Sequence, residues 1–170
     1  MKKIGLLGGS FDPPHRGHLF ISNEAKKVLH LDEIWWLVTP QNPLKISKPA
    51  TYEERLQNCK QITKNFPIKI LEVEKKIKSQ YSYQTIKFLI QYYKNIKFFW
   101  LMGADNLVNF HEWEKWQSIF HIISIVIFIV NFISLSIAIS LSLCLYLFLS
   151  LSLSLSLSLS ISISISLYPF

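Results

Sequence analysis

Charged side chains are missing from roughly the last third of this sequence. Its final Lys, Arg, Asp or Glu is Lys115, so the net charge of +7 belongs entirely to the residues up to that point. The 170-residue chain is therefore divided into two parts of unlike composition. A basic excess in the first part favours anionic partners such as nucleotides and phosphates, and biased base composition would produce a similar excess of lysine.

Cysteine is scarce, and the start of the chain lacks the pattern of a secretory signal. Cys59 and Cys144 form neither a metal-ligand spacing nor a disulfide framework, which favours a reducing compartment. Lys2 and Lys3 precede an apolar stretch that is too short for a signal peptide before Gly8 interrupts it. We therefore expect a cytoplasmic protein.

The first part of the chain alternates between the apolar period of strands and that of helices. The pattern predicts strands at 4–7, 33–40, 66–73 and 97–102, and helices at 17–29, from the capping residue Thr51 onward, and from 82 or 83 to 93. Alternating strands and helices indicate right-handed crossovers. We expect an α/β fold with a Rossmann-like, doubly wound parallel sheet.

Unusual residues gather where the strands of this expected sheet end. GGSFDPPHRGH follows the first strand, TPQNPLK the second, and GADN the fourth. Ligands of doubly wound sheets bind beyond the carboxyl ends of the strands. The three segments are therefore expected to face one crevice.

The first of these segments has the residue types of a phosphate-binding loop. Gly8 and Gly9 allow backbone N–H groups to approach an anion, and two prolines stiffen the loop after them. His15 and His18 are three residues apart, so both rings can project from the first turn of a helix beside its positive end. This geometry favours a polyphosphate. One alternative is that the two histidines form half of a metal site, for which we find no further ligands. The other is that they only cap the helix.

The same segment resembles the nucleotide-binding loop of the nucleotidylyltransferase superfamily, whose pattern is histidine or threonine, any residue, glycine and histidine. His15 and His18 match the two outer positions. Within the superfamily the chain is most similar to the bacterial nicotinate-nucleotide adenylyltransferases. That similarity rests on NPLK at 42–45, ERL at 54–56, YQT at 83–85 and GADN at 103–106, followed by Trp113.

The resemblance implies a reaction in NAD biosynthesis. The adenylyl group of ATP would pass to nicotinate mononucleotide, giving nicotinate adenine dinucleotide and pyrophosphate. ATP and nicotinate mononucleotide are then the partners, Mg²⁺ accompanies ATP, and neither a metal bound by the protein nor nucleic acid is expected. A sibling adenylyl- or cytidylyltransferase is one alternative. A catalytically impaired remnant that aggregates or associates with membranes is the other.

The resemblance also implies roles for individual residues. His15 and His18 are the catalytic candidates. The residues expected at ATP are these two histidines with Gly8, Gly9, Ser10, Phe11, Gly103 and Asp105. Those expected at the mononucleotide are Lys45, Thr85 and Trp113. The alternatives to these assignments are a solvated side chain for Lys45, a helix cap for Asp105, and core roles for Thr85 and Trp113. The aromatic residues Trp35, Trp36, Phe110 and Trp116 are expected to pack in the core.

The resemblance ends near residue 125. The family's carboxy-terminal phosphate-binding motif, isoleucine-serine-serine-threonine-any residue-arginine, is missing, and no arginine follows Arg55. We predict an incomplete nucleotidylyltransferase domain at 1–125 and a low-complexity Leu/Ile/Ser tail at 126–170 outside the family fold. Strict Leu-Ser alternation, which a TC dinucleotide repeat would encode, has no helical apolar face. Membrane contact is expected only if the tail is expressed and inserts.

Overall fold

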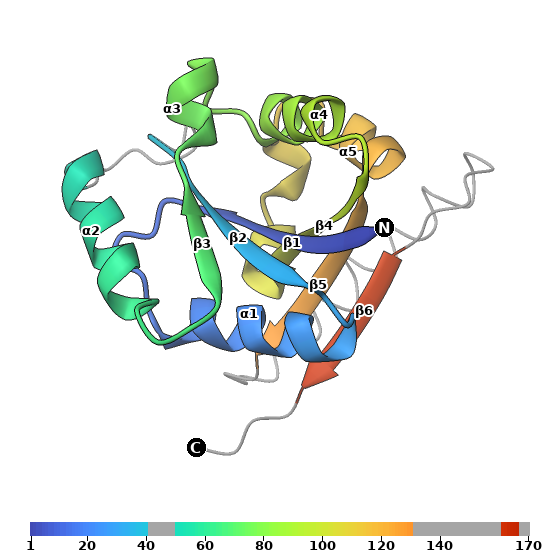
Figure 1. The fold of residues 1–170 in the computed structure, drawn as a ribbon. Helices are drawn as coiled ribbons and strands as arrows, with labels where there is room; N and C mark the ends of the chain where they lie inside the picture. Colours follow the sequence, from blue (N-terminus) through green and yellow to red (C-terminus); the bar gives the residue numbers. More distant parts are fainter. Residues whose placement is uncertain (41–49, 131–160, 167–170) are drawn as a thin grey trace.

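A single parallel sheet forms the centre of the molecule (Figure 1). The structure is a computed structural model that describes residues 1–40, 50–130 and 161–166. The strands are β1 (Lys2–Gly9), β2 (Glu33–Val38), β3 (Ile68–Leu71), β4 (Ile96–Gly103), β5 (Ser124–Val130) and β6 (Ile161–Ser166). They lie in the order β3-β2-β1-β4-β5-β6, and every neighbouring pair is parallel.

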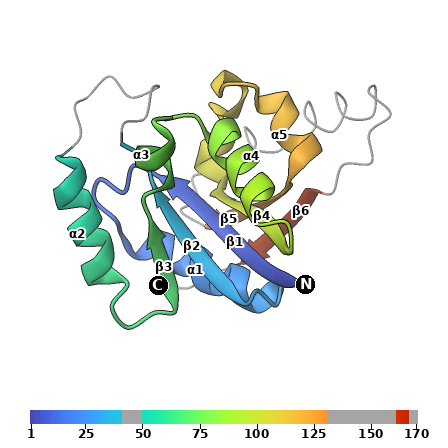
Figure 2. The same cartoon turned by 45° about the horizontal axis from the view of Figure 1, so that its top comes forward.

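Helices cover both faces of this sheet (Figures 1 and 2). The α-helices are α1 (Arg16–Val28), α2 (Tyr52–Ile62), α3 (Val73–Ile77), α4 (Ser82–Tyr92) and α5 (Trp116–Ile122), and two 3₁₀ turns are η1 (Ala104–Leu107) and η2 (Phe110–Glu112). Residues of α1 and α2 pack against one face, and residues of α4 and α5 pack against the other. The doubly wound α/β fold predicted from the sequence is confirmed.

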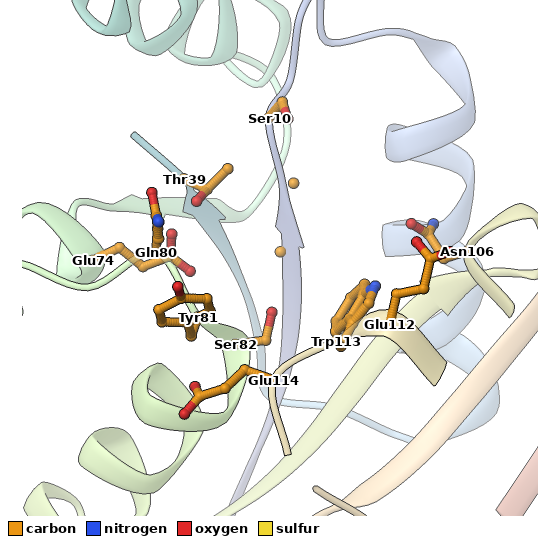
Figure 3. A pocket seen from close by; sticks show the side chains of 12 residues that line it. Ser10, Thr39, Glu74, Gln80, Tyr81, Ser82, Asn106, Glu112, Trp113 and Glu114 are labelled. Carbon is orange, nitrogen blue, oxygen red and sulfur yellow. The ribbon is translucent and has the colours of Figure 1, made fainter. Parts of the chain in front are cut away.

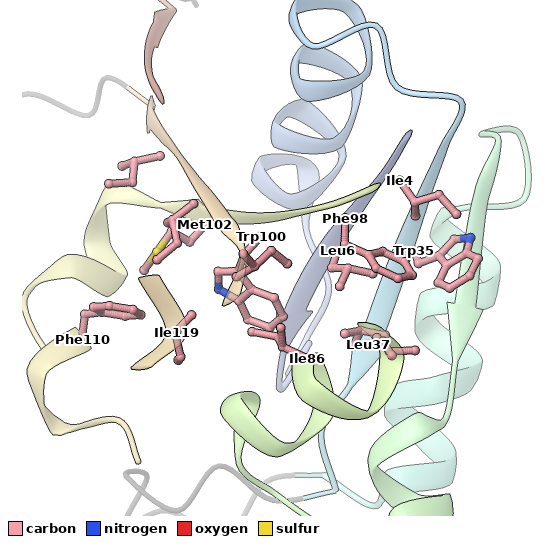
Figure 4. Close-up of a cluster of buried hydrophobic side chains, with 14 of the residues drawn as sticks. Ile4, Leu6, Trp35, Leu37, Ile86, Phe98, Trp100, Met102, Phe110 and Ile119 are labelled. Atoms are coloured by element: carbon pink, nitrogen blue, oxygen red, sulfur yellow. The ribbon is translucent and has the colours of Figure 1, made fainter. Parts of the chain in front are cut away.

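The strands are buried on both faces because their side chains alternate between two apolar clusters. Trp35 and Leu37 of β2 lie in the cluster beneath α4 and α5, which Figure 4 shows. Trp36 and Val38 of the same strand lie in the cluster beneath α1 and α2. The tryptophan pair is therefore divided between two cores, as expected for packing residues.

Three local predictions differ from the structure. The first strand continues through Gly8 and Gly9, which pair with Leu37 and Val38 instead of ending it. The third strand is shorter than predicted, and its last predicted residue, Val73, begins the short helix α3. The helix predicted at 17–29 is shifted by one residue, to Arg16–Val28, and Val28 at its end is 52% exposed.

Two strands bear on the predicted boundary at residue 125. β5 crosses that boundary and pairs with β4 from Phe99↔Ser124 to Gly103↔Phe128. β6 lies in the predicted tail and pairs with β5 from Ile125↔Ile161 to Val130↔Ser166. The division into a domain at 1–125 and a tail at 126–170 stays a prediction. No helix among the described residues is both long and apolar enough to cross a membrane.

A carboxylate at the start of β2 connects three strands. Glu33 accepts hydrogen bonds from Lys2 of β1 and from the indole of Trp35, and it forms an ion pair with Lys69 of β3 at 2.8 Å. The bond from Lys2 contributes most to lowering the pKa of Glu33, followed by Lys69 and Trp35, so that it falls from 4.5 to about 2. The charged form is thus favoured by folding.

Replacing Glu33 with glutamine is expected to make the free energy of unfolding less dependent on pH in the acid range. A lowered pKa in the folded state stabilises the protein above the unfolded value, and this contribution is lost as pH falls from about 4.5 to about 2. Glu33→Gln should lower the free energy of unfolding by about 1 kcal/mol at pH 7, since both lysines are well solvated, and by less at pH 3. Thermal unfolding at the two pH values measures this. The exposed Glu53→Gln should change little, and an equal loss at both pH values for Glu33→Gln would contradict the assignment.

Candidate functional site

The order of the strands reverses direction beside β1. Its neighbours are β2 on one side and β4 on the other, so successive crossovers run to opposite sides of the sheet. A crevice opens at such a point outside the carboxyl ends of the strands, and nucleotides bind there in this class of fold. Gly8 and Gly9 are the last two residues of β1 and Gly103 is the last residue of β4, so the topology brings these three predicted residues to one edge.

The glycine at position 8 is explained by packing. A Cβ built on Gly8 would lie 2.5 Å from the Trp100 ring, which occupies the space a side chain would need. A Cβ on Gly9 would meet only Phe11, at an ordinary contact distance of 3.5 Å. Neither glycine has a positive φ. Gly8 thus allows Trp100 to approach the strand, while both glycines line a pocket at this edge of the sheet.

Ser10 and Phe11 lead from β1 into the histidine segment. Phe11 has a φ of 49° and turns its ring into the core, where it is 2% exposed and stacks on Trp36 with centroids 4.6 Å apart. Its ring also lies 4.8 Å from that of His18. The side chain predicted to face ATP is therefore buried, and a nucleotide could contact Phe11 only through its backbone.

The two histidines form a reciprocal cap at the start of α1. His15 is the N-cap, and its Nδ1 accepts a hydrogen bond from the Gly17 backbone N–H at 3.1 Å. The backbone N–H of His15 donates in turn to Nδ1 of His18 at 3.2 Å, and the two rings are 3.9 Å apart. An Nδ1 that accepts a hydrogen bond carries no proton, so each neutral ring carries its proton on Nε2. Each capping bond uses only the Nδ1 atom of its ring, so capping of the helix is compatible with a chemical role for Nε2.

A buried arginine that sequence reasoning missed fixes the surrounding loops. Arg55 of α2 is 1% exposed, and its guanidinium donates to four backbone carbonyls. The acceptors are Ser10, Thr39, Pro40 and Ala50. These carbonyls follow the ends of β1 and β2 and precede α2, so one side chain joins three segments at the crevice.

A cavity of about 200 Å³ lies at this edge of the sheet (Figure 3). Its walls come from the ends of β1 and β2, from α3, from the turn before α4, and from the segment after β4. The lining residues are Gly8, Gly9, Ser10, Thr39, Glu74, Gln80, Tyr81, Ser82, Asn106, Glu112, Trp113 and Glu114. His15 and His18 are outside this set and lie next to it along the chain, at the amino end of α1.

Of the residues predicted at the mononucleotide, Trp113 lines the cavity. Its ring packs edge-on against Trp100 at 6.2 Å and lies 5.0 Å from Phe110, so one aromatic face is held in place. Thr85 is fully buried and is absent from the lining. Its hydroxyl lies 3.3 Å from Oε1 of Glu74, so it acts on the cavity through that carboxylate. Lys45 lies outside the described residues.

Gly103 and Asp105 form a close turn after β4. Oδ1 of Asp105 would lie 2.3 Å from a Cβ at position 103, so a larger residue there would require the carboxylate to move. Asp105 itself is exposed, and its Oδ2 accepts a bond from the Asn106 amide at 3.4 Å. Asn106 lines the cavity beside it. The two predicted residues are thus brought together next to Asn106, and neither of them is itself among the lining residues.

The part of the chain that the structure describes contains no group of three or more His, Cys, Asp or Glu side chains placed to hold a metal ion. Mg²⁺ commonly binds through substrate phosphates and water with one or two carboxylates, so it does not require such a group.

Comparisons with known proteins identify the family. The cytidylyltransferase-like family model matches residues 6–151. A probable nicotinate-nucleotide adenylyltransferase of Ruegeria sp. (strain TM1040) is 47% identical over 116 residues, which are 68% of this chain and 61% of the relative. One from Agrobacterium fabrum is 42% identical over 117 residues, 68% of this chain and 63% of the relative. The chain spans less than two thirds of the length of these relatives.

Solved structures share the fold. The nicotinic acid mononucleotide adenylyltransferase of Plasmodium falciparum, complexed with NaAD, matches with a TM-score of 0.71 and 17% identity, over all of this chain and 77% of that one. The same enzyme complexed with APC matches with a TM-score of 0.70 and 16% identity. The predicted resemblance and the Rossmann-like fold are confirmed, and the chain belongs to the cytidylyltransferase-like family.

Proposed function

We propose that this chain transfers the adenylyl group of ATP to nicotinate mononucleotide, giving nicotinate adenine dinucleotide and pyrophosphate. The observation that carries the proposal is the His15–His18 pair, whose capping bonds place the proton of each neutral ring on Nε2 at the amino end of α1. The named relatives support the same reaction. Because the chain spans only part of their length, the activity is a proposal for this chain.

The proposed mechanism consists of alignment and charge stabilisation. A phosphate oxygen of the mononucleotide attacks the α-phosphorus of ATP and forms the new P–O bond. The bond between that phosphorus and the oxygen that bridges it to the β-phosphate breaks, and pyrophosphate leaves with the electron pair of this bond. Hydrogen bonds from the two imidazole Nε2–H groups and the positive end of α1 would stabilise negative charge on the transferring and leaving groups.

The cavity supports a separate place for the acceptor. Trp113 offers an aromatic face on which a pyridine ring can stack, and the hydroxyls of Ser82 and Thr39 line the same space. The segment from Gly8 to His18 joins this cavity to the histidine pair, so two substrates bound at the two places would meet at the end of β1. Lys45, Asp105, Gly103 and the backbone of Ser10 and Phe11 complete the proposed contacts.

The residues present are compatible with Mg²⁺ that arrives on ATP. Asp105 is an exposed carboxylate next to Asn106 of the cavity lining and could accept a metal-bound water. When bound, the cation would supply charge neutralisation at the phosphates. The protein's own contribution is to bind and orient the two nucleotides.

Replacing His18 with alanine tests the proposal. We expect the rate of pyrophosphate release from ATP and nicotinate mononucleotide to fall by about 100-fold, because one preorganised donor to the transferring phosphate is lost. A coupled assay for pyrophosphate measures the rate, with nicotinamide mononucleotide and phosphopantetheine as alternative acceptors. His121→Ala is the matched control, because His121 is exposed on α5 and is not among the residues that line the cavity.

Each outcome of this assay has a meaning. Turnover with nicotinate mononucleotide that is lost in His18→Ala and retained in His121→Ala supports the proposal. Turnover only with phosphopantetheine would assign the chain to a sibling activity. No turnover with any acceptor would identify a catalytically impaired member of the family.

A further inference from the structure

The cavity wall contains a buried carboxyl group that the proposed mechanism does not use. Glu74, in the first turn of α3, is 3% exposed and lines the cavity. Its Oε1 lies 3.3 Å from the Thr85 hydroxyl, which is in position to donate to it. Its Oε2 is buried and has no hydrogen-bond partner in the described structure.

An unpartnered oxygen on a buried carboxyl group is costly. Buried polar groups in folded proteins are nearly always hydrogen-bonded, and leaving one unsatisfied costs about 1–3 kcal/mol. Glu74 borders the cavity, so a ligand there can supply the missing bond. In Figure 3, Glu74 lies beside Gln80 and Tyr81 on one side of the cavity, and Trp113 lies across from them.

In the part of the chain that the structure describes, the other charged side chains that line the cavity with Glu74 are acidic. Among the described residues, the cavity lining contains Glu112 and Glu114 from the segment around η2 and no lysine or arginine. From α2, Tyr52 faces the same region, and burial is the main cause that raises its pKa, so the phenol is neutral. On α3 itself, Lys75 is exposed and pairs with Glu53 at 3.3 Å.

The two pyridine mononucleotides place opposite demands on such a residue. Nicotinate carries a carboxylate, which only accepts hydrogen bonds, whereas nicotinamide carries an amide, whose NH₂ group donates them. A neutral Glu74 has an O–H that can donate to the carboxylate in a strong charge-assisted bond. An ionised Glu74 would repel the carboxylate and accept from the amide.

We propose that Glu74 is a specificity-determining residue of the acceptor pocket, whose Oε2 hydrogen-bonds the substituent on the pyridine ring, and that its neutral form selects the acid over the amide. This inference rests on the proposed function for the choice of acceptor. Thr85 is the positioning residue, because its hydroxyl occupies Oε1 and leaves Oε2 to the ligand.

The ionisation of Glu74 supports this assignment. Burial raises the pKa of its carboxyl group above the ordinary value, and the nearby hydroxyls of Thr39 and Thr85 oppose that rise only in part. The neutral form is therefore accessible at a higher pH than for a solvated glutamate. A ligand carboxylate beside it would favour the neutral form further.

The test is the pH dependence of acceptor preference. Dissociation constants of nicotinate and nicotinamide mononucleotide are measured on the full chain by quenching of tryptophan fluorescence, at several pH values between about 5 and 9. The preference for the acid should fall by up to about tenfold per pH unit once Glu74 ionises, because the neutral fraction falls by that factor. Both ligands carry the same phosphate, so effects of pH on the binding of that phosphate cancel in the ratio.

Glu74→Gln is the decisive variant, because glutamine has the same shape, keeps an oxygen for Thr85 and does not titrate. Its acid-to-amide ratio should be independent of pH, whereas Glu112→Gln, which removes a more exposed carboxylate from the same cavity, should keep the wild-type dependence. A wild-type ratio that does not change with pH, or an unchanged dependence in Glu74→Gln, would overturn the proposal.

Binding separates this proposal from the proposed function. If the chain binds both ligands with the expected pH dependence and releases no pyrophosphate, the catalytic proposal fails and the role of Glu74 stands. If it binds neither mononucleotide, the role of Glu74 is refuted. If it releases pyrophosphate with a ratio insensitive to pH, only the role of Glu74 fails.

Discussion

Replacing Arg55 with alanine is expected to lower the free energy of unfolding by about 3–5 kcal/mol. The guanidinium is 1% exposed and donates to the carbonyls of Ala50, Thr39 and Pro40 at 3.0, 2.9 and 2.7 Å, and also to that of Ser10. Alanine would leave these acceptors without a donor, and it would create a void in place of the arginine side chain. Both effects destabilise the folded state.

Denaturant unfolding followed by tryptophan fluorescence measures the loss. Lys60→Ala is the matched control, because Lys60 is an exposed basic residue on the same helix and its removal should change stability by less than about 0.5 kcal/mol. Arg55→Lys should be nearly as harmful as alanine, since an ammonium group cannot reach the diverging carbonyls that the planar guanidinium joins. A loss below about 1 kcal/mol in Arg55→Ala would show that water replaces the lost bonds.

Arg55 also shows where sequence reasoning fails. Charged residues on an amphipathic helix normally face water, and nothing in α2 itself distinguishes Arg55 from its neighbour Glu54, which is exposed. Its partners lie at Ser10, Thr39 and Pro40, between 15 and 45 residues away in the sequence. Only the folded chain brings their carbonyls together. Glu74 was missed for the same reason, because its burial and its contact with Thr85 arise only in the folded chain.

Features with a local cause were predicted well. Apolar runs and apolar spacing gave the order of strands and helices, and Thr51 was correctly expected to cap α2, where its hydroxyl accepts from the Glu54 backbone N–H. The crevice at the ends of β1 and β4 followed from that order alone. Gly8 was interpreted as a residue that lets backbone N–H groups approach an anion, and the structure adds a packing reason, the Trp100 ring from a neighbouring strand. The local sequence does not show which side chain from a distant segment will fill the space beside a given residue.

Replacing Trp36 with alanine is expected to cost about 3–5 kcal/mol of stability and to weaken the site as well. Trp36 is fully buried, stacks on Phe11, and donates its indole N–H to the Ser22 hydroxyl at 2.8 Å. That hydroxyl donates to the backbone carbonyl of His18, also at 2.8 Å. A core side chain is thereby connected to the first turn of α1, where the proposed catalytic pair lies.

Two further variants separate packing from this connection. Trp36→Phe keeps an aromatic ring for Phe11 and removes the indole donor, so we expect a smaller stability loss with a raised KM for ATP. Trp116→Ala removes a tryptophan that is only half-buried and remote from α1, so stability should fall by less and the KM for ATP should not change. Urea unfolding and the pyrophosphate assay provide the two readouts. If Trp36→Phe and Trp116→Ala had the same KM as the wild type, the bonds through Ser22 would serve stability alone, and the position of His18 would depend on its own reciprocal cap with His15.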